Sequence, residues 1–242
     1  MLGALAALLG PRVVDAQPSK SARVGVLASS TEANFGPSVT GLVSNLARPG
    51  GNVTGVSGFS PEPGGKRLEL LREIIPRVER IGVLLNRANA ATAPVLRAAE
   101  AAARQTRMRL QVVDVPQLSE LPAAFEALTR ARSEALLLVA DPRLFGGTRR
   151  IVELAARHRT PAVSETARFA ERGGLVSCGP LAQERFHQMA VYVDRTLRGS
   201  RPGELPFERP RTFESVPNLE AARALGLEIP SPLRLRADRV IE

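Results

Sequence analysis

Cysteine and histidine are almost absent from this 242-residue chain, and their scarcity excludes two kinds of site. Cys178 is the only cysteine, so no disulfide can form within the chain. The two histidines, His158 and His187, lack an H-E-x-x-H motif and a neighbouring cysteine pair. Metal sites in proteins need clustered ligands of these types. We therefore expect no metal site.

Aromatic residues and lysines are also rare. Aromatics make up 4% of the chain, with no tryptophan and one tyrosine, which leaves few rings on which nucleic-acid bases could stack. The net charge is nevertheless +9, and a basic surface attracts nucleic acids and membranes. Nearly all basic residues are arginines, scattered over expected helix faces at positions such as Arg67, Arg72 and Arg104. We interpret them as solvated surface charge and predict no nucleic-acid partner.

Motifs of enzymes and of nucleotide cofactors are missing as well. The stretch GVSGF (55–59) fails the nucleophile pattern G-x-S-x-G by one position, and neither GxGxxG nor a phosphate-binding loop occurs. Cys178, His187 and Asp194 could be imagined as a nucleophilic triad, but the last two stand two turns apart on one expected helix. We predict no cofactor and no enzymatic activity, with a small α/β enzyme kept as an alternative.

The N-terminus lacks an apolar run of membrane-spanning length. Leu2 to Leu9 is apolar but too short to span a bilayer, and Pro11 ends it. Val14 and Ala16 fit the small-residue positions of a cleavage site. We predict a signal peptide over residues 1–16 and a periplasmic location. No Arg or Lys precedes the apolar run, so the alternative is an amphipathic helix of a cytosolic protein.

The chain does contain a regular alternation of apolar strands and helices from residue 78 onward. Strands are expected at 80–86, 110–115, 134–141, 161–165 and 173–179, and helices at 92–108, 119–132, 147–159 and 182–199. Continuous apolar strands that alternate with helices are typical of a parallel sheet covered on both faces. The sequence therefore predicts an α/β fold with a doubly wound parallel sheet, followed by an edge strand within 211–218.

The part before residue 78 holds much less. Only two strands are evident, at 23–29 and 52–58, and the residues between them can supply a single helix. Parallel strands are normally joined by a crossover of a dozen or more residues. We expect these two strands to lie adjacent and parallel, beside the last strand near 213–216.

Polar residues that directly follow the strands are the candidates for a binding site, because ligands of open parallel sheets bind at the carboxyl ends of the strands. These residues are mostly neutral, which suits hydrogen bonding to a zwitterionic or polyhydroxylated molecule, with Asp141 or Glu165 facing a cationic group. The alternative for each is an ordinary turn residue that caps the next helix. The candidates are Ser29, Ser30, Ser57, Asn86, Asn89, Asp141, Ser164, Glu165 and Cys178.

Several stretches together resemble a known family. The segment GLVSNLARPGGNVTGVSGFSPEPGGKRLELLREIIPRVERIGVLLN (41–86) is similar throughout to ABC-transporter substrate-binding proteins of the tryptophan/tyrosine type, and GGLVSCGP and NLEAARALGLEIPSPLRLRADRVIE extend the resemblance. The resemblance implies a type I periplasmic-binding-protein fold, in which two α/β lobes close on a ligand. It implies a truncated first lobe at 17–77, a second lobe at 78–180 and a return segment at 181–242 that packs across both lobes.

Three features depart from the family pattern. The βα units expected before the GLVSNLARPGG helix are missing, an expected Asp-Pro is replaced by Gly36-Pro37, and an expected aromatic residue is replaced by Cys178. Each departure removes a ligand contact that the resemblance implies. A truncated, binding-deficient relative is therefore an alternative to a working receptor.

The function implied by the resemblance is solute binding for an ABC uptake transporter. The ligand is expected to be an amino acid or similar small polar molecule, the partner an ABC permease of the inner membrane, and the protein a monomer. A ligand-sensing domain of a transcription regulator shares this fold but would require a helix-turn-helix, which the N-terminus does not offer.

Overall fold

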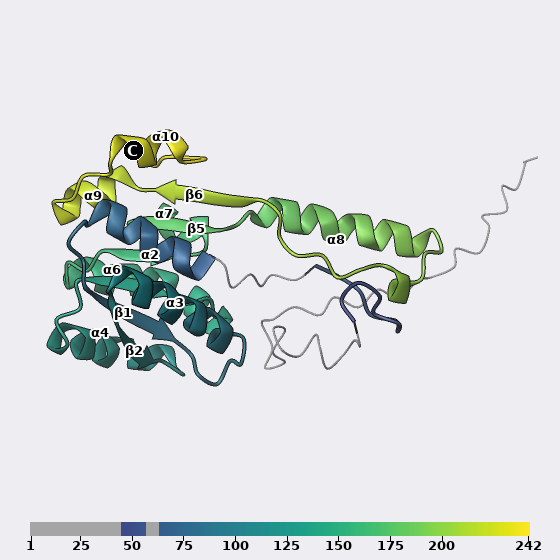
Figure 1. Cartoon of the computed structure of the whole chain (residues 1–242), viewed down its shortest axis with the longest axis horizontal. Helices are drawn as coiled ribbons and strands as arrows, with labels where there is room; N and C mark the ends of the chain where they lie inside the picture. The colour runs from purple at the N-terminus through teal and green to yellow at the C-terminus, as the bar shows by residue number, and fades with distance from the viewer. Residues whose placement is uncertain (1–44, 57–62) are drawn as a thin grey trace, which may run out of the picture.

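The computed structural model describes residues 45–56 and 63–242, and its six-stranded sheet lies in the left half of the view in Figure 1. The strand order is β2-β1-β3-β4-β5-β6. The first five strands run parallel, and β6 is antiparallel to β5. The strands are β1 (Arg80–Leu85), β2 (Arg109–Asp114), β3 (Ala135–Leu138), β4 (Ala162–Ser164), β5 (Val176–Pro180) and β6 (Phe213–Pro217).

Helices follow the strands in the expected alternation, which confirms the predicted α/β class with a mainly parallel sheet. The helix expected over 147–159 is preceded by a separate short helix, because Asp141 and Pro142 start a helix of their own directly after β3. The α-helices are α2 (Pro63–Ile74), α3 (Thr92–Thr106), α4 (Leu121–Arg130), α5 (Pro142–Gly146), α6 (Thr148–Arg157), α7 (Ala167–Glu171), α8 (Ala182–Leu197), α9 (Leu219–Leu225) and α10 (Ser231–Arg236), and the 3₁₀ turns are η1 (Leu118–Glu120) and η2 (Pro202–Glu204).

The two faces of the sheet form two separate hydrophobic clusters. Successive residues of a strand point to opposite faces, so Val83 of β1 belongs to the cluster with α2 and α3, whereas Leu84 belongs to the cluster with α4 and α6. Burial on both faces explains why the central strands are uninterrupted apolar runs. The sheet is thereby held as a rigid platform for the residues at its edges.

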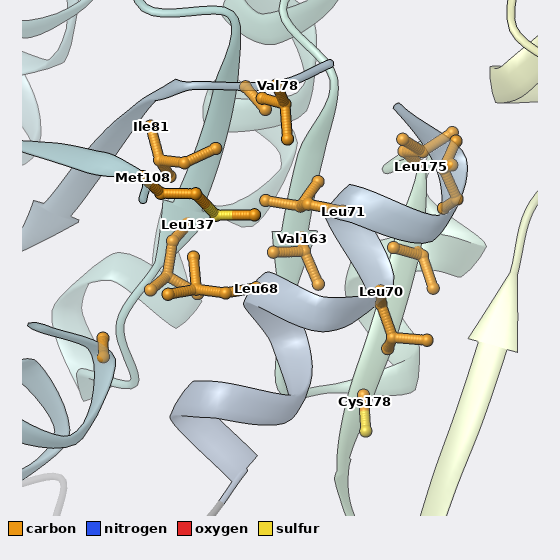
Figure 2. Close-up of a cluster of buried hydrophobic side chains, with 14 of the residues drawn as sticks. Leu68, Leu70, Leu71, Val78, Ile81, Met108, Leu137, Val163, Leu175 and Cys178 are labelled. Atoms are coloured by element: carbon orange, nitrogen blue, oxygen red, sulfur yellow. The ribbon is translucent and has the colours of Figure 1, made fainter. Parts of the chain in front are cut away.

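Helix α2, which lies within the range 17–77 expected to form a first lobe, packs on this sheet. Leu68 and Leu71 of α2 are fully buried and lie in the same cluster as Leu137 of β3 and Val163 of β4 (Figure 2). Burying a leucine side chain contributes about 1.5–3 kcal/mol. The apolar face of α2 therefore fixes the helix to the sheet.

The outer edge of β6 is paired with the C-terminal tail. The Ser215 N–H donates to the Asp238 carboxylate at 2.7 Å, and the Asp238 N–H donates to the Ser215 carbonyl at 3.1 Å. The Ile241 N–H then donates to the carbonyl of Pro217 at 3.0 Å. An exposed strand edge invites pairing with other chains, and the tail blocks it here.

Helix α8 leads away from the sheet, and the segment 45–56 lies beside the loop that follows it (Figure 1). Residues 52–56 form no strand, contrary to expectation: the structure shows an isolated parallel bridge between Val56 and Glu208. The Glu208 N–H donates to Gly55 O at 3.1 Å, and Thr54 Oγ1 donates to Leu205 O at 2.7 Å. The polar groups of this segment pair with the loop before β6 instead of a sheet strand. The strand expected at 23–29 lies outside the described residues.

We expect the phenol of Tyr192, on α8, to titrate near pH 12. Its hydroxyl donates to the Pro206 carbonyl at 2.6 Å and lies 3.2 Å from Glu208 Oε1. Burial, with the charge of Glu208, raises the pKa of Tyr192 to about 12. A raised folded-state pKa means that this stabilisation is complete below the unfolded pKa of about 10 and is lost as the pH rises through the folded value.

Tyr192 is the only tyrosine and the chain has no tryptophan, so ultraviolet absorbance of the phenolate reports on this side chain alone. The urea-unfolded chain is the control, with an expected midpoint near about 10. The same midpoint in the folded chain would disprove the packing of α8 against the loop at 206–208.

Candidate functional site

The carboxyl ends of β1, β3, β4 and β5 lie along one edge of the sheet, because these strands are parallel neighbours. Ligands of open parallel sheets bind at such an edge. Apart from Ser164, the predicted site residues in the described part of the chain form two groups there. One follows β1 and β3, and the other follows β4 and lies on β5.

The first group consists of Asn86, Asn89 and Asp141. Asp141 Oδ2 accepts hydrogen bonds from Asn86 Nδ2 at 3.2 Å and from Asn89 Nδ2 at 2.9 Å. Asp141 Oδ1 accepts from the N–H groups of Arg143 at 2.9 Å and Leu144 at 3.2 Å, which makes Asp141 the N-cap of α5. Both oxygens of this buried carboxylate are thus engaged within the protein. Asp141 therefore caps a helix, as the alternative to a ligand-binding role stated.

The loop after β1 orients both asparagine amides. Asn86 Oδ1 accepts from the Ala88 N–H at 3.1 Å, and Asn89 Oδ1 accepts from the Ala91 N–H at 3.0 Å. Thr92 Oγ1 lies 3.0 Å from the Asn86 carbonyl oxygen and 2.8 Å from that of Asn89. An amide nitrogen carries two hydrogens, so the contact with Asp141 occupies one N–H of each asparagine.

The second group consists of Glu165, Cys178 and the unpredicted Arg67. Arg67 Nη2 lies 3.5 Å from Glu165 Oε2, and the side chains are 1% and 17% exposed, respectively. Cys178 is buried on β5 beside the first half of α2 (Figure 2). The three side chains converge where α2 crosses the ends of β4 and β5.

Burial dominates the electrostatics of this group. Burial raises the pKa of Glu165, while the guanidinium groups of Arg67 and Arg185 partly oppose that shift. Burial also lowers the pKa of Arg67, opposed by the Glu165 carboxylate. The pKa of the Cys178 thiol is raised by burial, which disfavours a nucleophilic thiolate.

The expectation that Arg67 is a solvated helix arginine is wrong. Its position is four residues before Leu71 and seven before Ile74, both buried in the core. Residues at this spacing share one face of a helix. The helical period of α2 therefore places Arg67 on the buried face. This spacing is visible in the sequence and could have predicted the burial of Arg67.

The remaining candidates lie apart from these two groups or outside the described residues. Ser164 is fully buried, and by strand alternation it shares the face of Ala162, opposite the face of Glu165. Ser29, Ser30 and Ser57 lie outside the residues that the structure describes.

The edge as a whole offers hydrogen-bond donors, one partly exposed carboxylate and a buried guanidinium. These groups suit a small molecule that carries charges of both signs. Within residues 45–56 and 63–242 no group of three or more His, Cys, Asp or Glu side chains could hold a metal ion. No helix in the same described ranges has the length and apolar character needed to cross a bilayer.

Comparison with known proteins places the chain among ABC-transporter components. The sequence profile of the family described as ABC transporter substrate binding protein matches residues 22–241. A tyrosine-binding protein of Clostridioides difficile is 22% identical over 204 residues, which are 84% of this chain and 57% of that protein. The chain thus spans little more than half the length of this curated relative.

Solved structures agree with the family match. An ABC domain from Streptococcus pneumoniae in complex with L-Trp has a TM-score of 0.78 at 26% identity, over 85% of this chain and 68% of that chain. A conserved domain protein from Vibrio cholerae has a TM-score of 0.78 at 28% identity, over 84% and 68% of the two chains. These neighbours have the type I periplasmic-binding-protein fold, as the sequence predicted. The chain belongs to the family of ABC transporter substrate-binding proteins.

Proposed function

We propose that this chain binds a free amino acid at the carboxyl edge of its sheet and serves an ABC permease as the solute-binding component. The observation that carries the proposal is the position of Asn86 and Asn89 after β1 and of Glu165 after β4, at the same carboxyl edge of one parallel sheet with β3 between the two strands, in a chain of this family. Amide donors and a carboxylate complement the carboxylate and ammonium of an amino acid.

The relatives narrow the ligand class. One similar structure holds L-Trp, and one similar protein is named for tyrosine binding. We propose an aromatic amino acid as the ligand, bound without covalent chemistry, and a periplasmic location for the monomeric protein. In this proposal Asn86 and Asn89 donate to the ligand, while Asp141 holds both amides in place.

Thermal unfolding with added L-tryptophan, L-tyrosine and other amino acids tests the proposal. A ligand that binds only the folded state at 100 times its Kd adds about 2.7 kcal/mol of stability, which raises Tm by several degrees in a chain of this size. The expected result is a rise with L-tryptophan or L-tyrosine and none with the D-enantiomers. A cooperative transition that no amino acid shifts would contradict the proposal and favour a binding-deficient relative.

A further inference from the structure

Arg67 is a buried cation with few partners. Its side chain is 1% exposed, and its Nε and Nη1 atoms are buried with no hydrogen-bond partner among the described residues. Within residues 45–56 and 63–242, the one hydrogen bond or ion pair of the guanidinium joins Nη2 to Glu165 Oε2 at 3.5 Å. Charge-assisted hydrogen bonds between such groups are normally about 2.7–2.9 Å long, so this contact is weak.

This arrangement is unfavourable for folding alone. A buried charge costs several kcal/mol unless it is paired and hydrogen-bonded, and buried polar atoms in proteins nearly always find a partner. An apolar side chain at position 67 would continue the buried face formed by Leu68 and Leu71. A cation at this position instead indicates an anion that completes its hydrogen bonds.

The position of Arg67 points to the ligand edge. Helix α2 ends at Ile74 and a short connection leads to the start of β1 at Arg80, so the C-terminus of α2 lies at the amino edge of the sheet. Its first half therefore lies at the carboxyl edge, where Arg67 meets Glu165 after β4 and Cys178 on β5. This is the edge at which the proposed function places the amino acid.

We propose that Arg67 and Glu165 form a recognition pair for a zwitterionic amino acid, with the guanidinium binding the ligand carboxylate and Glu165 binding the ligand ammonium. The ligand carboxylate replaces the 3.5 Å contact from Glu165, whose more exposed side chain then turns to the ammonium group. The positive charge of Arg185, on α8, partly opposes the rise that burial causes in the pKa of Glu165. This inference rests on the proposed function and adds which residues bind the carboxylate and the ammonium group of the ligand.

The test compares each amino acid with an analogue that lacks one charge. Calorimetric affinities for L-tryptophan and L-tyrosine are measured beside those for their methyl esters, which keep the ammonium but lose the carboxylate charge. The protein variants are Arg67→Met and the matched control Arg72→Met, an exposed arginine on the same helix. Hydrogen bonds to a charged group predict that Arg67→Met weakens binding of the acid by about 100-fold.

The result that decides the question is whether Arg67→Met changes the ratio of the affinity for the acid to the affinity for its ester. We expect the unsubstituted chain to prefer the acid over its ester by about 100-fold, and the Arg67→Met chain to bind acid and ester alike. Arg72→Met should keep the full preference. Equal weakening of acid and ester by Arg67→Met, or a preserved preference for the acid, would overturn the proposal.

A second measurement separates this proposal from the proposed function. The double variant Arg67→Met, Glu165→Gln removes both charges with little change in volume, and we expect its Tm to be higher than that of the unsubstituted chain. A lower Tm would make the pair a structural element and overturn the recognition role. If no amino acid binds, the proposed function fails, whereas a higher Tm of the double variant still supports an anion-recognition site at Arg67.

Discussion

Replacing Asp141 with alanine is expected to lower the free energy of unfolding by about 3 kcal/mol. The substitution removes the N-cap of α5, which accepts from the N–H groups of Arg143 and Leu144. It also leaves the Nδ2 atoms of the buried Asn86 and the half-buried Asn89 without their acceptor. Unsatisfied buried donors cost about 1–3 kcal/mol each. Urea unfolding followed by far-ultraviolet circular dichroism measures the loss.

Two further substitutions show whether the stability loss in Asp141→Ala comes from the lost helix cap or from the loss of a negative charge. Asp141→Asn retains one carbonyl oxygen for the cap but brings an amide nitrogen towards the asparagine donors, so an intermediate loss is expected. Asp194→Ala removes an exposed carboxylate of α8 that pairs with Arg198, the residue after the helix; exposed pairs contribute about 0–1 kcal/mol, so little change is expected. Unchanged stability of Asp141→Ala would show that the four hydrogen bonds contribute nothing to folding.

The sheet is predictable from the sequence because its cause is local. Continuous apolar runs such as 80–86 and 134–141 require cover on both faces, and the only common solution is a parallel sheet between helices. The structure confirms both runs as neighbouring strands, β1 and β3. β1 ends one residue before the end of its run and β3 ends three residues before the end of its run, so the pattern places Asn86 and Asp141 beyond the carboxyl ends of these strands.

The roles of the site residues are less predictable because they depend on contacts between distant segments. Asp141 satisfies the same pattern whether it binds a ligand or caps a helix, and only its hydrogen bonds to Asn86 and Asn89 distinguish the two. The partner of Glu165 comes from α2, 98 positions earlier in the chain. No spacing rule connects Arg67 to Glu165, although the period of α2 indicates that Arg67 faces inward.

The segment 45–56 shows the limit of strand prediction from composition. Residues such as Val53, Thr54 and Val56 have high β propensity, but a strand needs a partner whose edge is open. The edge of β6 is covered by the C-terminal tail through Asp238. The segment instead pairs with the loop at 203–208, whose Gly203 lies so close that an added Cβ would meet Gly51 O at 2.5 Å.

Gly179→Ala is expected to destabilise the fold by about 3 kcal/mol and to weaken ligand binding. Gly179 lies on β5, opposite Glu214 of β6. A Cβ at this position would lie 2.0 Å from the carbonyl oxygen of Glu165 and 2.8 Å from its carbonyl carbon. Backbone atoms cannot move aside as a flexible side chain can, so either β5 or the segment after β4 must shift.

The same shift would displace Glu165. We therefore expect this one substitution to lower both the free energy of unfolding and the affinity for the amino acid. Gly146→Ala is the matched control, because an added Cβ there meets nothing within 4 Å, and alanine at a compatible position is neutral or stabilising by about 0.4–1 kcal/mol. Urea unfolding and amino-acid affinity are measured for both variants. Gly179→Ala with unchanged stability would disprove the close approach of β5 to Glu165. Lost stability with unchanged affinity would instead remove Glu165 from the ligand contacts, because a carboxylate that binds the ammonium cannot move without changing the affinity.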